Sequence, residues 1–114
     1  AGQGAPCWAT TAGKYVFVAN TGGRTISRLI GTGRNAFVDD ATAATIATGG
    51  GPADIDAGNG IVAVIDRGNG QSHLSLFTYN TFGELDAHGA PIAIGVPSAN
   101  GVAILDPKVG DRDN

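Results

Sequence analysis

The chain has 114 residues, 19 of them Gly, with one Cys, no Met and a formal net charge of −3. This length allows one small domain, and a single Cys excludes a disulfide-stapled miniprotein and a Cys-rich zinc module. The negative charge and the absence of a basic run give no support to a nucleic-acid partner or an anionic membrane surface.

The apolar runs are short, and the first residues carry no targeting pattern. The longest runs, residues 61–65 and 102–105, fall far below the ~20 residues that a membrane-spanning helix needs, so no membrane partner is expected. The chain does not begin with Met, and residues 1–6 lack the charged and apolar regions of a signal peptide. We therefore expect a processed or excised piece, and the amino-acid usage favours a secreted or extracellular protein. Cys7 is interpreted as a small buried residue, with a reactive thiol and an intermolecular link as the alternatives.

Alternation of apolar residues and a high content of β-branched residues predict an all-β protein. Residues 14–20 and 60–66 are short apolar runs that end at Gly-rich turns, which is typical of strands buried on both faces. Each is followed by a second strand, residues 25–30 and 73–79, so each pair is predicted to form a β-hairpin. Residues 39–48 are rich in Ala and Thr without an apolar stripe, and are interpreted as a turn that leads into a short strand.

An internal repeat is the most informative feature of the sequence. Placing Pro6 against Pro52, an offset of 46 residues, aligns strand with strand and puts Asp66 at the position of Asn20. A third start follows at Pro97. A period of about 45 residues with four short strands per unit is typical of β-propeller blades, which bury their faces only by stacking on neighbours.

The predicted architecture is therefore about two four-stranded antiparallel β-propeller blades plus one extra strand, an incomplete ring. Residues 1–50 are assigned to the first blade-like repeat, residues 51–96 to the second, residues 97–106 to an extra closing strand and residues 107–114 to a flexible tail. Propellers close with roughly 4 to 8 blades, so the expected partners are other copies of the chain or a complementary propeller chain. A compact β-sandwich monomer is the alternative fold at this strand spacing.

Residues 6–27, with residues 49–55 and 95–103, resemble the blades of the seven-bladed β-propeller lactonase family, which includes 6-phosphogluconolactonases and carboxymuconate cyclases. The resemblance covers residues 5–105 and matches only the C-terminal third of the family. It implies the fold of the last blades and, in a completed ring, a lactonase-like hydrolase. The turns that precede the second strand of each repeat keep Gly but lack the Pro-Asp pair usual in the family. No catalytic residue is carried over, because the family's active residues come from several blades.

Asp54 and Asp56 form the best polar constellation of the sequence. They alternate on one predicted strand, so both carboxylates face the same side, where they suit a cation or acid–base chemistry. The alternative is that they hydrogen-bond turn amides of neighbouring blades. Trp8 and Thr10 take the equivalent positions in the first repeat. Trp8, Asp54 and Asp56 are therefore the candidate residues for binding a small or sugar-like ligand, with simple packing as the alternative, and the catalytic residues stay unknown.

No metal site and no cofactor are predicted. His73 and His88 have no second ligand at zinc spacing and are interpreted as solvated or capping residues. Asp39 and Asp40 are interpreted as an acidic pair in a turn. The G-x-G-x-x-A pattern of residues 31–36 matches a dinucleotide fingerprint, but a poor helix sequence follows it, so a hairpin loop between the third and fourth strands is favoured.

Two functions from different classes follow. The first is a binding or assembly protein that contributes blades to a ring and binds a small ligand. The second is a lactonase-like hydrolase that is active only in the completed propeller. Such a hydrolase needs a group that activates water and a cation or amides that stabilise an oxyanion. The available cations are expected in or beside turns: Arg24, Arg28, Arg34 and Arg67.

Overall fold

The computed structural model describes residues 6–32, 35–68, 70–96, 99 and 101–105. Within these residues the chain forms strands and no helix, and accordingly no helix suited to spanning a membrane is found there. The strands are β1 (Pro6–Ala12), β2 (Tyr15–Asn20), β3 (Thr25–Thr32), β4 (Asn35–Thr45), β5 (Gly51–Gly58), β6 (Ile61–Gly68), β7 (Gln71–Tyr79), β8 (Leu85–Ala87) and β9 (Ile92–Ala93).

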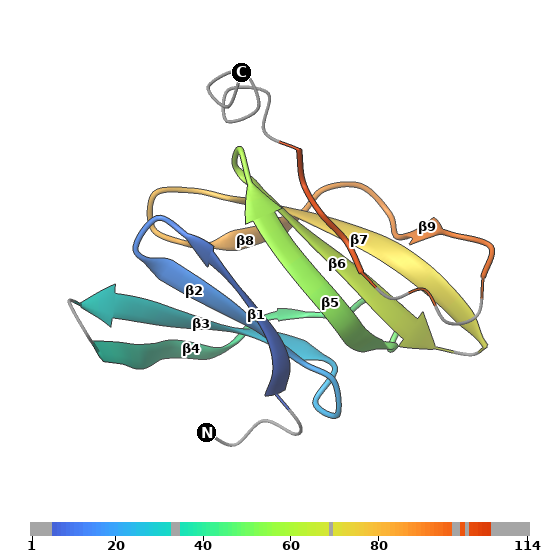
Figure 1. Ribbon diagram of the computed structural model, residues 1–114, viewed down its shortest axis with the longest axis horizontal. Coiled ribbons are helices and arrows are strands. Elements are labelled where there is room, and N and C mark those ends of the chain that lie inside the picture. Colours follow the sequence, from blue (N-terminus) through green and yellow to red (C-terminus); the bar gives the residue numbers. More distant parts are fainter. Residues whose placement is uncertain (1–5, 33–34, 69, 97–98, 100, 106–114) are drawn as a thin grey trace.

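The strands form two antiparallel sheets, in agreement with the all-β prediction (Figure 1). The N-terminal sheet has the order β1-β2-β3-β4. The C-terminal sheet has the order β5-β6-β7-β8. β8 pairs with the end of β7, and the short strand β9 pairs with β7 nearer its start, at His73 and Leu74. The two sheets meet through their first strands, because β5 contacts both β1 and β2.

Both predicted hairpins are confirmed. β2 pairs with β3 from Tyr15 to Asn20, and β6 pairs with β7 from Ile61 to Gly68, each without a register shift. The turn between β5 and β6 places Asn59 and Gly60 at φ of 53° and 79°. Both residues are common in this left-handed region, which a tight two-residue hairpin turn requires.

The interpretation of residues 39–48 as a turn that leads into a short strand is wrong in its order, because residues 39–45 belong to β4 and the turn follows at residues 47–48. β4 continues to Thr45 and pairs with β3, with register shifts on either side of Arg28. These irregularities break the alternation of exposed and buried side chains, so the sequence carries no period of two there. A dinucleotide fingerprint must be followed by a helix, but a strand begins at Asn35. Residues 31–36 therefore do not form a dinucleotide site of that kind.

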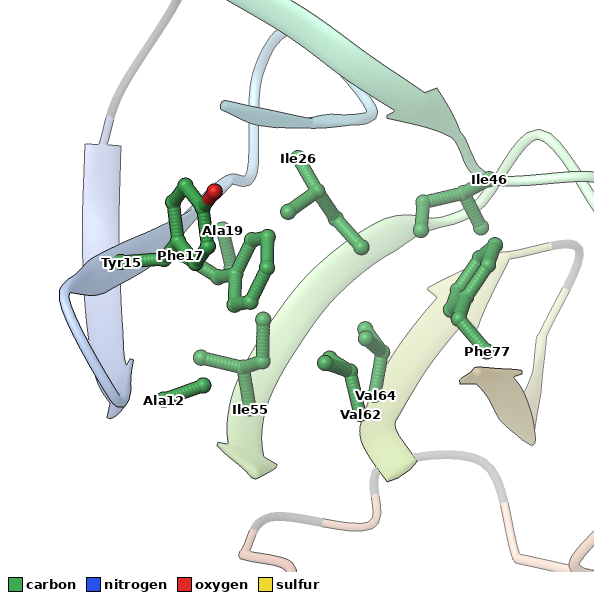
Figure 2. Close-up of a cluster of buried hydrophobic side chains, with 10 residues drawn as sticks. All are labelled: Ala12, Tyr15, Phe17, Ala19, Ile26, Ile46, Ile55, Val62, Val64 and Phe77. Atoms are coloured by element: carbon green, nitrogen blue, oxygen red, sulfur yellow. The ribbon is translucent and has the colours of Figure 1, made fainter. Parts of the chain in front are cut away.

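The hydrophobic core lies between the two sheets (Figure 2). The N-terminal sheet and the connection to β5 contribute Ala12, Tyr15, Phe17, Ala19, Ile26 and Ile46; the C-terminal sheet contributes Ile55, Val62, Val64 and Phe77. β6 is buried on both faces as predicted, whereas β2 is not, because its burial alternates from Tyr15 to Val18. The N-terminal sheet therefore has one buried face and one partly exposed face.

Of the closing strand predicted for residues 97–106, the structure describes residues 99 and 101–105, and none of these residues is in a strand. Residues 101–105 form no β-ladder with a described strand, but they lie beside β5 on the side away from β1. Residues 97, 98, 100 and 106, and the tail predicted at residues 107–114, lie outside the described residues. Residues 101–105 are called the C-terminal segment below.

Candidate functional site

The three candidate ligand residues lie on the first strands of the two sheets. Trp8 is on β1 and is 44% exposed, and Asp54 and Asp56 are on β5 and are half-buried. β1 has a register shift just before Trp8, and β5 has one at the equivalent place just before Asp54. The matching irregularities give both strands the same local shape, so equivalent positions point the same way.

Both carboxylates of β5 accept hydrogen bonds from the C-terminal segment. The amide of Val102 donates to Oδ2 of Asp54 at 2.9 Å, and the amide of Ile104 donates to Oδ2 of Asp56 at 2.6 Å. The other oxygen of Asp54 accepts the amide of Ile55 at 2.8 Å. Asp54 and Asp56 thus face the same side, as the alternation predicts, and they bind the chain's own backbone.

The same kind of contact joins the two sheets. Oγ1 of Thr10, which is equivalent to Asp56, accepts the amide of Ala57 at 3.2 Å and donates to Oδ1 of Asp56 at 3.4 Å. In each repeat, the side chain at this position therefore accepts an amide of the segment that follows about one repeat later. β1 relates to β5 as β5 relates to the C-terminal segment.

A second hydrogen bond between repeats also recurs, from a side chain that lies at or after the end of the second strand to a backbone carbonyl of the next repeat. Oγ1 of Thr21 donates to the carbonyl of Pro52 at 2.7 Å, and Nε of Arg67 donates to the carbonyl of Ala99 at 3.0 Å. Thr21 and Arg67 are equivalent in the repeat, so Ala99 takes the place of Pro52. The structure thus sets the third repeat two residues later than the alignment of Pro97 with Pro52, a shift that preserves which side each residue faces.

A buried polar cluster was not identified as a functional candidate from the sequence. Asp66 is fully buried; its Oδ1 accepts Oγ1 of Thr48 at 2.7 Å, and its Oδ2 accepts Oγ of Ser75 at 3.3 Å. At the equivalent position, Nδ2 of Asn20 donates to Oγ of Ser27 at 2.9 Å. The signal was present in the alignment of the repeats, since both a polar residue and its serine partner recur.

Among the described residues, His73 and His88 make different contacts, and neither belongs to a group of three or more possible metal ligands. Nδ1 of His73 lies 3.6 Å from Oδ1 of Asp66, beyond hydrogen-bond distance, and has no hydrogen-bond partner among the described residues. His88 is exposed, and its amide donates to the carbonyl of Leu76. Within the described part of the chain, no group of three or more His, Cys, Asp or Glu side chains is arranged to hold a metal ion.

Two sequence interpretations of charged residues are corrected. Asp39 and Asp40 lie within β4 rather than in a turn, and Arg28 lies within β3. Arg28 pairs with Asp39 at 2.6 Å and donates to the carbonyl of Gly83 at 2.9 Å. This pairing bridges the N-terminal sheet to the turn after β7, so Arg28 is engaged structurally. Arg34 lies outside the described residues.

The grooves between the sheets in the described part of the chain include two that are open to solvent. One, of about 570 Å³, has largely apolar walls, and its lining includes Lys14, Tyr15 and Tyr79. The hydroxyl of Tyr15 is already used, since it donates to the carbonyl of Thr81 at 3.0 Å. The other groove, of about 310 Å³, is polar and lies beside Arg28. Neither groove contains Trp8, Asp54 or Asp56.

No protein-family model, curated protein or solved structure matches the chain. The assignment of a role therefore depends on the geometry alone. Hydroxyl groups do lie beside carboxylates in this geometry, Ser75 beside the fully buried Asp66 and Thr10 beside Asp56. The recurring feature of the first strands is that they bind the backbone of the next segment through side chains at repeated positions.

Proposed function

We propose that the chain is an assembly module of a β-propeller, in which the two sheets are consecutive blades and the ring is completed by other copies or by a complementary chain. The observation that carries this proposal is the recurrence of contacts between repeats. Thr10 accepts the amide of Ala57, and its equivalent Asp56 accepts the amide of Ile104. A contact that repeats in the same direction is expected where units stack on their neighbours.

The outer face of the N-terminal sheet carries apolar residues, which favours a blade that stacks on a neighbour and argues against a self-contained two-layer sandwich. In a sandwich, the residues facing away from the core are polar. The N-terminal sheet instead places Val16, Val18 and Leu29, all half-exposed, on the face away from the C-terminal sheet, together with Val38, which is 51% exposed. Apolar residues on both faces of a sheet are typical of a sheet that has neighbours on both sides.

In this proposal Asp54 and Asp56 hold consecutive repeats together. The ligand role first considered for Trp8, Asp54 and Asp56 would require a ligand to replace the amides of Val102 and Ile104. The hydrolase alternative depends on the lactonase resemblance alone, because both carboxylates are already engaged and no described cation faces them.

The native mass of the purified chain tests the proposal. Native mass spectrometry and light scattering are measured over a wide range of concentration, and urea unfolding is followed on the same samples. We expect a defined multimer whose stability rises with concentration, because ring closure buries the outer faces. A monomer of 11.3 kDa that unfolds cooperatively at every concentration would contradict the proposal and indicate a self-contained sandwich.

A further inference from the structure

We propose that the exposed face of the N-terminal sheet binds a second copy of this chain head to tail, through the far face of that copy's C-terminal sheet. This inference rests on the proposed function and names the surfaces and the partner. The exposed face is called the open face and is defined by two rows of paired residues. The rows are Thr11–Val16–Leu29–Val38 and Ala9–Val18–Ser27.

The open face has a counterpart that is already covered within the chain. The equivalent rows of the C-terminal sheet are Ala57–Val62–Phe77–Ala87 and Ile55–Val64–Ser75. Val62 and Val64 are fully buried against the N-terminal sheet, whereas their equivalents Val16 and Val18 are half-exposed. The same face is thus buried in one sheet and open in the other, which identifies the type of surface that covers it.

The face that covers Val62 and Val64 has an equivalent face in the C-terminal sheet, and that equivalent is partly exposed. Val62 and Val64 pack against the face of the N-terminal sheet that carries Phe17 and Ile26 (Figure 2). The equivalent face of the C-terminal sheet, called the far face, carries the row Asp54–Ile65–Leu74–Ile92. Its outer part is open, since Leu74 is half-exposed where its equivalent Ile26 is fully buried, and Ile92 is 51% exposed.

The open face and the far face are therefore the two halves of an interface that the chain makes once internally. Neither row of the open face contains a charged residue. On the far face, Asp54 accepts hydrogen bonds from backbone amides, and Asp56 accepts one from the amide of Ile104 and a longer one from the hydroxyl of Thr10. Two different surfaces that fit each other produce a head-to-tail contact, which closes into a ring when the rotation per copy allows it.

Docking requires the C-terminal segment to move. This segment lies beside β5 in the place that β5 takes beside β1, and Ile104 lies against Gly58, where an added Cβ would come within 3.2 Å of Cγ2 of Ile104. A second copy brings its own β1 to that place. The geometry thus requires that β1 of the second copy displaces the C-terminal segment and offers the amide of Thr11, the equivalent of Ala57, to Asp56.

Cross-linking of the full-length chain tests the orientation. Two single-cysteine proteins are made in a Cys7→Ser background, one with Val18→Cys on the open face and one with Leu74→Cys on the far face, and one of them is isotopically labelled. After mixing, a short bismaleimide reagent is added and products are identified by mass. We expect the mixed 18-to-74 product to predominate, because the equivalent residues Val64 and Ile26 share one core cluster.

The other outcomes separate this inference from the proposed function. A multimer that gives mainly 18-to-18 products, or no product at either position, overturns the head-to-tail interface and leaves assembly itself intact. A chain that stays monomeric overturns this inference, and it overturns the proposed function as well if the monomer unfolds cooperatively at every concentration. An occupant of a different kind, such as a complementary propeller chain, would leave this chain monomeric on its own.

Two substitutions measure the strength of the same contact. Leu29→Lys should weaken association at least about a hundredfold, because it buries an unpaired charge in the interface. The matched control is Phe82→Lys, which alters a residue that is 72% exposed in the turn after β7 and should leave association unchanged. Ile104→Gly should strengthen association roughly tenfold by loosening the C-terminal segment. Weaker association of Ile104→Gly would overturn the displacement, and equal effects of both lysine variants would overturn the docking face.

Discussion

Replacing Asp56 with Ala tests whether the carboxylate binds the next segment of the chain. The side chain accepts the amide of Ile104 at 2.6 Å and a weaker bond from Thr10 at 3.4 Å. A hydrogen bond to a charged group contributes about 1.5 to 3 kcal/mol when both groups are well buried. Asp56 is half-buried, so solvent screening places the expected loss near the lower bound, about 1.5 kcal/mol.

Two measurements read out this loss. In urea unfolding, 1.5 kcal/mol corresponds to a fall of roughly 1 M in the midpoint, given typical slopes for small proteins. In amide hydrogen exchange, the Ile104 amide should lose its protection selectively, because its acceptor is removed. Asp56→Asn keeps one acceptor oxygen and should retain more than half of the stability difference. Asp86→Ala, which removes an exposed carboxylate on β8, is the control and should change neither quantity.

The reasoning is refuted if Asp56→Ala leaves the midpoint and the exchange of Ile104 unchanged. That result would mean that the carboxylate is solvated in the free chain and available to a ligand. Measuring at several protein concentrations keeps the effect on folding distinct from any effect on association.

Further substitutions at four positions test the core, two turns and the surface. Asp66→Ala should lower the free energy of unfolding by about 3 kcal/mol because it leaves the buried hydroxyl of Ser75 and the half-buried hydroxyl of Thr48 without their acceptor. Asp66→Asn should lose less than half of this, since the first repeat has Asn there, and equal losses would contradict the shared role. Gly83→Ala should be destabilising by more than about 2 kcal/mol, because φ is +73° and the added Cβ would lie 2.8 Å from Cδ of Arg28. Gly13→Ala, with φ of +60° and open space around it, should lose only about 1 kcal/mol; chemical denaturation compares the two. Asp39→Ala, which breaks the ion pair with Arg28, should lower stability by less than about 1 kcal/mol, and by less still at high salt, which screens the pair; a larger loss in thermal unfolding would contradict this expectation.

The strands with apolar alternation were predictable, and those without it were not. Residues 14–20 and 60–66 correspond to β2 and β6 because each alternates or fills both faces with apolar side chains. β4 is held by backbone pairing to β3 while its first residues are exposed and its register shifts, so no side-chain period marks it. β8 and β9 have 3 and 2 residues, which is too short for a period to appear.

The candidate site was predictable in its residues but not in its partners. Alternation correctly placed Asp54 and Asp56 on one side of a strand. Their bonding partners Val102 and Ile104 are 48 residues away, and no local pattern specifies such a distance. Only the repeat points to them, and the alignment of Pro97 with Pro52 was two residues out of register with the contact that Ala99 makes.

Differences between the two repeats follow from what each first strand must hold. Thr10 holds β5, which is also paired with β6 along its length, so a neutral hydroxyl suffices there. Asp54 and Asp56 hold residues 101–105, which pair with no described strand. Ionised acceptors form stronger hydrogen bonds to amides than hydroxyl groups do, and two of them lie where backbone pairing is missing. Trp8, the equivalent of Asp54, has no such segment to hold. The two carboxylates therefore lie where a segment without backbone pairing has to be bound. If β1 of a second copy covered β5, removing the carboxylates should cost less in the free energy of unfolding.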